Sequence, residues 1–240
     1  MNRITMSTPF TALAALGILL FALGQPAGAQ DGTALTGTAV VEPHVARAEL
    51  LPTPPAAPEE ALSAPNDFIV QRNTSLGYAG THNWTSSTNE PSLAESNSDV
   101  VFFSGNWYAS LSLDGGQTFS FINPFTLFPA SYGGFCCDQV VQYDRSHDLF
   151  IWLLQYVKDS NANIQRIAVA TSADLRNGSG WTYWDITPQL LGWPSLREWD
   201  FPDMSVGSTY LYVTSNVFAT SGGSSLGSTV WRMSLAQLAA

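Results

Sequence analysis

Short apolar runs separated by turn residues recur along most of the chain. Residues 107–113 alternate large apolar side chains with small or polar ones, which is the pattern of a strand with one buried face. Residues 149–154 are apolar throughout, as is typical of a strand covered on both faces. No stretch after residue 66 has the spacing of a long amphipathic helix. We therefore predict an all-β domain, with strands in the runs 99–105, 106–113, 148–157, 165–172, 209–218 and 228–235.

The runs are organised as a repeat whose units begin with a carboxylate, at Glu90, Asp138 and Asp203. These starts lie 48 and 65 residues apart, and a four-stranded propeller blade takes roughly 40–50 residues. The third unit stops after its third predicted strand, whereas a closed propeller has typically about four to eight blades. The sequence thus predicts an incomplete propeller of about three antiparallel blades in a truncated chain. The alternatives are that residues 66–88 form part of another blade or that copies associate to close the ring.

The segment SLDGGQTF at residues 112–119 carries a more specific motif. Its Asp-Gly-Gly core predicts a hairpin turn, because glycine adopts positive φ at little steric cost. A plain turn requires neither the serine before this core nor the threonine and phenylalanine after it. The segment SADLRNGSGWTY at residues 172–183 repeats the order with four extra residues in the turn. The motif positions are Ser112, Asp114, Gly116, Thr118 and Phe119, then Ser172, Asp174, Gly180, Thr182 and Tyr183.

These two segments resemble the Asp-box, or BNR repeat, of exported bacterial sialidase-like β-propellers, and the resemblance covers residues 90–235. It implies four-stranded blades with a box at the turn between the third and fourth strands. It also implies that Asp114 and Asp174 are structural residues that bind backbone N–H groups, away from the substrate face. The F-R-I-P motif of true sialidases is absent from the sequence, and three arginines do not fall on equivalent inner strands. The resemblance therefore implies the fold but not sialidase activity.

The first 65 residues differ in composition from the rest. Arg3, an apolar core at 12–23 and the small residues at 27–29 predict a secretory signal peptide over residues 1–29. Residues 30–65 are rich in Ala, Pro and Thr and predict a disordered linker. The propeller domain then spans residues 66–240, with no further segment apolar enough to cross a membrane. The sequence thus predicts a secreted, periplasmic or cell-envelope protein.

Charge is sparse and mostly acidic, with 19 Asp and Glu against 9 Lys and Arg and a net charge of -10. Such a chain lacks the basic surface that binds nucleic acid. The acids Glu90, Asp138 and Asp203 stand at the starts of the predicted innermost strands, which converge in a propeller. Convergent carboxylates predict a Ca²⁺ site or the acid and base of glycoside hydrolysis. The alternative is that each acid accepts hydrogen bonds from its own loop.

The only two cysteines, Cys136 and Cys137, are adjacent and precede Asp138. In an oxidising compartment a lone pair of cysteines is predicted to join. A vicinal disulfide would form a rigid apolar platform on the presumed ligand face. The alternatives are two free thiols or links to another chain.

The segment PSLREWDFPD at residues 194–203 concentrates arginine, acids and tryptophan, the residue types that line a sugar-binding rim. Trp152, Trp184 and Trp231 are predicted to be packing residues. The predicted ligand-binding residues are Trp107, Cys136, Cys137, Arg197, Trp199 and Asp200.

Two functions fit these features. The first is a non-catalytic binding or scaffold propeller that engages extracellular glycans or similar polymers. The alternative is a glycoside hydrolase-type enzyme with Glu90, Asp138 and Asp203 as its acids. The absence of sialidase motifs favours the first, and the convergent acids beside the cysteine pair favour the second.

Overall fold

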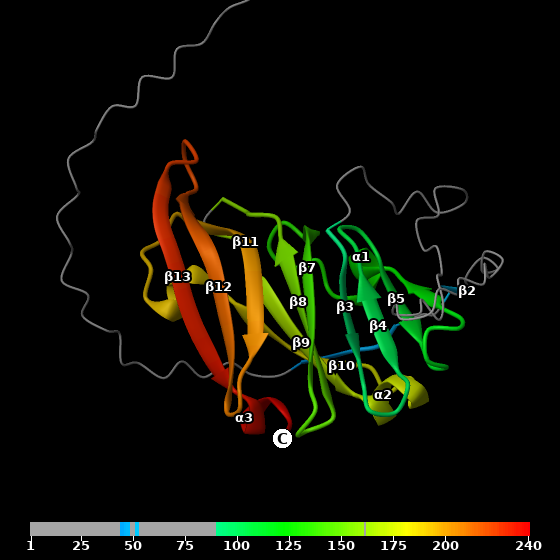
Figure 1. The fold of residues 1–240 in the computed structure, drawn as a ribbon. Helices are drawn as coiled ribbons and strands as arrows, with labels where there is room; N and C mark the ends of the chain where they lie inside the picture. Colours follow the sequence, from blue (N-terminus) through cyan, green and yellow to red (C-terminus); the bar gives the residue numbers. More distant parts are fainter. Residues whose placement is uncertain (1–43, 49–50, 53–89, 161) are drawn as a thin grey trace, which may run out of the picture. The chain divides into compact units, whose positions relative to one another are not determined.

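The computed structural model describes residues 44–48, 51–52, 90–160 and 162–240. These residues form mostly antiparallel β-sheet with short helices, and none of their sheets closes into a barrel (Figure 1). The all-β prediction is confirmed at this level. The predicted signal peptide over residues 1–29 and most of the predicted linker lie outside the described residues. In the described part of the chain, no helix has both the length and the apolar character needed to cross a membrane.

The strands form three sheets. Sheet I has the order β2-β6-β5-β4-β3, formed by Leu51–Pro52, Ser120–Ile122, Ala109–Ser112, Val101–Ser104 and Ser92–Glu95. Sheet II has the order β1-β10-β9-β8-β7, formed by His44–Ala46, Trp181–Ile186, Gln165–Thr171, Leu149–Tyr156 and Phe135–Asp144. Sheet III has the order β11-β12-β13, formed by Arg197–Val206, Tyr210–Ala219 and Ser225–Ser234. The helices are α1 (Pro124–Leu127), α2 (Ser172–Asn177), the 3-10 helix η1 (Pro188–Leu191) and α3 (Leu235–Leu238).

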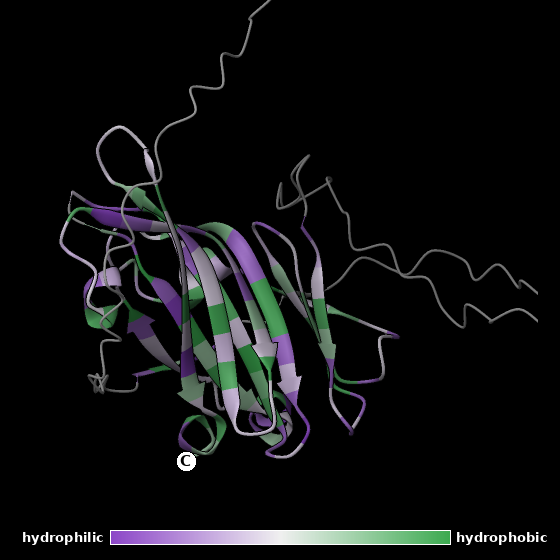
Figure 2. Cartoon of the chain, turned by 60° about the vertical axis from the view of Figure 1, so that its left-hand side comes forward, coloured by the Kyte–Doolittle hydropathy of each residue, from purple (hydrophilic) through white to green (hydrophobic). Residues whose placement is uncertain are grey.

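Hydrophobic patterning accounts for most of the strands, but the one-sided burial predicted for residues 107–113 is wrong, because all four residues of β5 are buried. Every residue of β8 is buried, as its continuous apolar run predicted, because sheet II has a core on each face. Strand β12 alternates between buried and exposed residues, since sheet III contributes only one of its faces to a core. Figure 2 shows this alternation as hydrophobic and hydrophilic bands along sheet III. All six predicted runs overlap strands of the structure.

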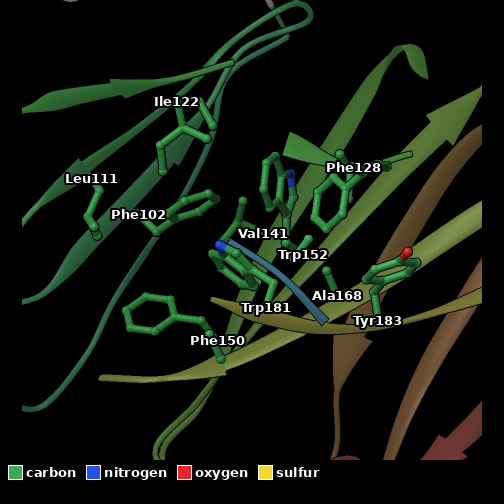
Figure 3. Packing of buried hydrophobic residues seen from close by; sticks show 14 of the residues in the cluster. Phe102, Leu111, Ile122, Phe128, Val141, Phe150, Trp152, Ala168, Trp181 and Tyr183 are labelled. Atoms are coloured by element: carbon green, nitrogen blue, oxygen red, sulfur yellow. The ribbon is translucent and has the colours of Figure 1, made fainter. Parts of the chain in front are cut away.

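Two hydrophobic clusters join the sheets. The first draws on sheets I and II, and its centre is a group of aromatic rings (Figure 3). There the Phe102 ring lies 4.9 Å from that of Trp152 and 5.0 Å from that of Trp181, between centroids. The second cluster draws on sheets II and III and includes Trp199 stacked on Trp231, with centroids 6.4 Å apart. The packing roles predicted for Trp152 and Trp231 are confirmed, since both are buried in these clusters.

Buried amides tie neighbouring sheets together. Strand β7 contacts both β3 and β11. The Gln139 side chain on β7 donates to the carbonyl oxygens of Gly105 and Tyr108 in sheet I and accepts from Trp152 Nε1 at 2.9 Å. Toward sheet III, Asn163 accepts from the backbone N–H of Trp199 at 2.8 Å and donates to its carbonyl at 2.6 Å. These bonds fix the register between neighbouring sheets, because an unpaired buried amide is costly.

Two short strands come from the segment predicted as a linker. Strand β1 pairs with β10, with His44 opposite Tyr183 and Ala46 opposite Trp181. Strand β2 pairs with β6 at the edge of sheet I. The ordered residues 44–46 and 51–52 fall inside the segment predicted as a linker, most of which lies outside the described residues. These two strands form because the edges of sheets I and II offer unpaired backbone groups. Pairing with a distant edge leaves no local pattern in the sequence from which the strands could be predicted.

Candidate functional site

Strands β3, β7 and β11 each begin a run of consecutive antiparallel strands and are called the first strands of their sheets. Each of them is irregular, or follows an irregular residue, near the same place. Glu90 precedes β3 and has φ 42, while Asp138 lies at a bulge in β7 with φ 21. In β11 a bulge falls between Asp200 and Asp203, and Phe201 within it has φ 54. Positive φ is uncommon for residues other than glycine, and bulges re-aim side chains out of the regular ladder. The bulges in β7 and β11 therefore turn Asp138 and Phe201 out of the regular strand pattern.

These irregular positions surround a cavity of about 290 Å³, which we call the acid-lined cavity. The structure brings Glu90, Asp138 and Asp203 together around this cavity. Glu90 comes just before β3, Asp138 lies in β7 and Asp203 lies in β11. The catalytic role of these acids stays a prediction. The lining residues are Glu90, Pro91, Ser92, Asp138, Gln139, Val140, Phe201, Pro202 and Asp203.

The carboxyl groups around this cavity interact directly. Burial raises the pKa of Asp138 to about 6, helped by the negative charge of Glu90, by a hydrogen bond between the two side chains, and by the charge of Asp200. Two carboxyl groups joined in this way share one proton at acidic pH and repel once both are ionised. Asp203 is exposed and accepts from the backbone N–H of Met204 at 2.8 Å. Asp203 matches the alternative of a local backbone hydrogen bond, and Asp138 matches it in part, since its carboxylate also accepts from its own backbone N–H.

Asp138 is expected to make folding stability pH-dependent. The folded protein holds its proton more tightly than the unfolded chain, so this stabilisation is full below pH 3.8 and is lost as pH rises through about 6. The shift corresponds to about 3 kcal/mol, which half exposure to solvent reduces to about 1 kcal/mol. Asp138→Asn should remove this loss, so that the variant is more stable than the wild type by about 1 kcal/mol above pH ~7.

Urea unfolding at pH values from about 4 to 8 measures this difference. The exposed Glu95, at the far end of β3 and outside the acid-lined cavity, provides the control substitution Glu95→Gln. A wild-type pH profile that Asp138→Asn leaves unchanged would contradict the prediction.

A second cavity, of about 320 Å³, adjoins the same two strands β7 and β11; we call it the disulfide cavity. A disulfide bond joins Cys136 and Cys137, which confirms the predicted pairing. Glu198 is held by Lys158 through an ion pair of 2.8 Å, and Lys158 Nζ also donates to the Thr220 carbonyl at 3.1 Å. The lining residues are Cys136, Gln155, Tyr156, Asn163, Glu198, Trp199, Asp200, Phe218 and Gly223.

The predicted ligand-binding residues have different places. Cys136 and Asp200 line the disulfide cavity, with Cys137 joined to the first of them. Trp199 also borders it, but the residue is only 1% exposed and its ring stacks on Trp231, so it belongs to the core and is no open stacking platform. Arg197 and Trp107 line neither cavity. Trp107 is 41% exposed in the β4–β5 loop, and Arg197 donates to the adjacent Leu196 carbonyl.

The SLDGGQTF segment forms a closed hydrogen-bonded turn between β5 and β6. Asp114 accepts from the backbone N–H groups of Gln117 and Thr118 at 3.0 and 2.9 Å and from the hydroxyls of Ser112 and Thr118 at 2.8 and 2.7 Å. Burial raises the pKa of Asp114, but these hydrogen bonds together outweigh it and hold that pKa below its ordinary value. Phe119 is buried. The serine, threonine and phenylalanine thus have structural roles, as does Asp114.

The second predicted box has another structure. Residues 172–177 form helix α2, and Asp174 closes a capping box with Thr171 instead of binding a turn. Thr171 Oγ1 accepts from the Asp174 backbone N–H at 3.1 Å, and the Asp174 carboxylate accepts from Thr171 N at 3.0 Å. Gly180, Thr182 and Tyr183 lie at or in β10, apart from this cap. The prediction of an interrupted box is therefore wrong in its hydrogen bonding, although Asp174 is structural.

Comparison with known proteins gives no relatives. No protein-family model matches the chain, and no curated protein or solved structure is significantly similar to it. The resemblance to Asp-box proteins therefore rests on the sequence motif alone. Across the described part of the chain, no group of three or more His, Cys, Asp or Glu residues is placed to hold a metal ion.

Sequence reasoning missed Phe201 and the amides Gln155 and Asn163. Phe201 lines the acid-lined cavity and is 67% exposed, whereas the neighbouring Trp199 is buried. The signal was the order Asp-Phe-Pro-Asp, because an aromatic residue between two acids and before a proline does not fit a regular strand. The amides lacked a sequence signal, since their partners are distant backbone groups.

Proposed function

We propose that the protein is an exported protein with β-propeller blades that binds an extracellular glycan without catalysis. The observation that carries this proposal is the pair of cavities whose linings both combine residues of β7 and β11. Ligand sites in β-propellers lie where the first strands of several blades meet. A site assembled from several sheets is therefore what the proposed fold would use for binding.

Support for the propeller comes from chain order. Strands β3 to β6 and β7 to β10 form two consecutive up-and-down sheets, and β11 to β13 begin a third. The first strand of the middle sheet contacts the first strands of both neighbours. Radial repetition of antiparallel blades has this connectivity. The turn formed by Ser112, Asp114 and Thr118 also lies between the third and fourth strands of its sheet, where the resembling family places its box.

Support for a glycan comes from the residue types around the cavities. Sugar sites combine aromatic surface with a few fixed polar groups. Phe201 and three carboxylates border one cavity, and Phe218, Glu198 and Asp200 border the other. Volumes of about 290 and 320 Å³ are at the small end of ligand sites, which begin at about 300 Å³. Each would take a single sugar unit of a longer polymer.

Support for binding without catalysis comes from the contact between Glu90 and Asp138. Glu90 raises the pKa of Asp138 through its negative charge and a hydrogen bond between the two side chains, so the two carboxyl groups interact directly. The two carboxyl groups of a retaining glycosidase stand about 5–5.5 Å apart on either side of the scissile bond, and those of an inverting enzyme lie farther apart still. A pair of acids in direct contact favours binding over this chemistry.

One observation favours the alternative of a glycoside hydrolase. The pKa of Asp138 is raised to about 6, chiefly by burial, and a general acid needs its proton at working pH. In that case Asp138 would donate the proton and the exposed Asp203 would act as the second carboxylate.

A polysaccharide panel tests both functions with the full chain. We expect a neutral, an amine-bearing or an acidic polysaccharide to retain the protein and to release no reducing ends. Asp203→Asn with Glu90→Gln should weaken retention about tenfold, a loss of about 1.4 kcal/mol, while Glu95→Gln should not change it. Retention by none of the polysaccharides would refute the proposal. Release of reducing ends by the wild type but not by Asp138→Asn would replace it with the hydrolase.

A further inference from the structure

Phe201 stands out from its neighbours on β11. Two residues, Phe201 and Pro202, lie between the paired positions Asp200–Asn216 and Asp203–Thr214 and have no partner on β12. Pro202 is buried whereas Phe201 is 67% exposed. A single exposed apolar residue is ordinary on a protein surface. This one is different because its bulged backbone holds it at the edge of a cavity.

The charge around Phe201 is of one sign. The residues that line the acid-lined cavity include three carboxylates and no lysine, arginine or histidine. Asp200, which adds its negative charge at Asp138, lies next to Phe201 in the chain. A cavity lined by one sign of charge attracts ligands of the opposite sign and repels those of the same sign. Sugars that carry carboxylate or sulfate groups are therefore disfavoured.

The face of an aromatic ring adds to this preference. It packs against the apolar face of a ring-shaped ligand, and it also attracts cations through its quadrupole. A ligand with both a flat ring and a positive charge satisfies Phe201 and the carboxylates together. Among units of extracellular polymers, the protonated amino sugar has this chemistry.

We propose that the acid-lined cavity binds a protonated amino-sugar unit, with Phe201 against the face of the sugar ring and the ammonium group facing the carboxylate lining of the cavity. This inference rests on the proposed glycan-binding function and names the class of glycan. Phe201 is then the residue that selects ring-shaped cations, and the carboxylates exclude acidic sugars.

Calorimetry with the full chain tests the inference, with oligomers of glucosamine, N-acetylglucosamine, glucose and galacturonic acid of equal length as probes. We expect the glucosamine oligomer to bind at least about tenfold more tightly than the others at low salt, and Phe201→Ala to weaken its binding about tenfold. Phe201→Trp should keep the affinity, since tryptophan also offers an aromatic face. Tyr212→Ala is the matched control, because Tyr212 is exposed on β12 and lines neither cavity.

The other possible results distinguish a failure of the amino-sugar inference from a failure of the proposed glycan-binding function. Tighter binding of the neutral or acidic oligomers would overturn the amino-sugar inference and leave the glycan function standing. Equal affinity of Phe201→Ala and wild type for the glucosamine oligomer would overturn the role of Phe201. No binding of any oligomer, together with no retention on the polysaccharide panel, would overturn both. Thermal unfolding of Phe201→Ala, expected to match the wild type closely, shows that lost binding is not lost folding.

Discussion

Arg166→Met is expected to lower the free energy of unfolding by about 3 kcal/mol, the lower end of the cost of breaking a buried ion pair, because the Asp185 carboxylate left behind is partly exposed. Arg166 lies on β9 and is fully buried. Its guanidinium donates to both carboxylate oxygens of Asp185 on β10, at 2.6 and 2.7 Å. Such a bidentate pair is among the stronger polar interactions in proteins.

The same guanidinium organises the loop before β7. It donates to the Pro129 carbonyl and the Ser131 hydroxyl, both at 3.3 Å, and to the Tyr156 hydroxyl. Its central carbon lies 4.2 Å from the Tyr183 ring centroid and 4.5 Å from that of Tyr156. Methionine would fill part of the volume but leave the Asp185 carboxylate and these acceptors without their donor, and unpaired buried groups carry the desolvation cost.

Chemical denaturation with circular dichroism measures this loss. Arg232→Met is the matched control, because Arg232 is exposed and lies over the Tyr210 ring at 4.1 Å, an arrangement worth about 0.5–1 kcal/mol. The double variant Arg166→Met with Asp185→Asn should recover part of the stability, since it removes the unpaired charge. If Arg166→Met loses no more stability than Arg232→Met, the buried pair is not a main support of sheet II.

The strands could be predicted because the local order of apolar and polar residues indicates which faces of a strand are buried. The apolar run at 149–154 indicated a strand covered on both faces, and β8 is buried throughout between two cores. The run TYLYVTSNVF was predicted as a strand, and in β12 its residues alternate between buried and exposed. In both cases the periodicity of side chains decides the structure, and no distant partner has to be known.

The second predicted box shows how a local pattern was misread. The spacing of serine, aspartate and threonine resembled the first motif, but the residue before it is Thr171. Thr171 and Asp174 form the pattern of a helix capping box, which was already present in the sequence. A helix turn competes with a hairpin for the same residues, and the four extra residues favoured the helix.

Half of the candidate site was within reach of sequence reasoning. The acids Glu90, Asp138 and Asp203 were found because each was predicted to stand at the start of an innermost strand. They line one cavity, although Asp138 and Asp203 lie within β7 and β11. Phe201 was missed because its exposure depends on a bulge, and a bulge is set by pairing with β12. Trp199 was misplaced for a related reason, since the bulge lies after it and leaves it facing the core.

Gly180→Ala is expected to lower the free energy of unfolding by about 2–3 kcal/mol, because it overfills a closed contact between β10 and β1. A Cβ at Gly180 would meet the Ala46 carbonyl oxygen, and it would lie 2.7 Å from Arg47 Cγ and 2.9 Å from the Ala46 carbonyl carbon. Two of these atoms are backbone, so β1 itself would have to move. The φ of 103 at Gly180 adds strain to any residue with a side chain.

Gly178→Ala distinguishes the steric contact with β1 from the strain of a positive φ. Gly178 also has positive φ, at 65, but a Cβ there would meet nothing within 4 Å. That variant should lose only about 1 kcal/mol, the cost of the left-handed conformation. Limited proteolysis should in addition cut Gly180→Ala faster near residues 44–48, as β1 leaves the edge of sheet II and exposes its backbone groups. Equal stability and equal cleavage of the two variants would mean that β1 does not hold this edge.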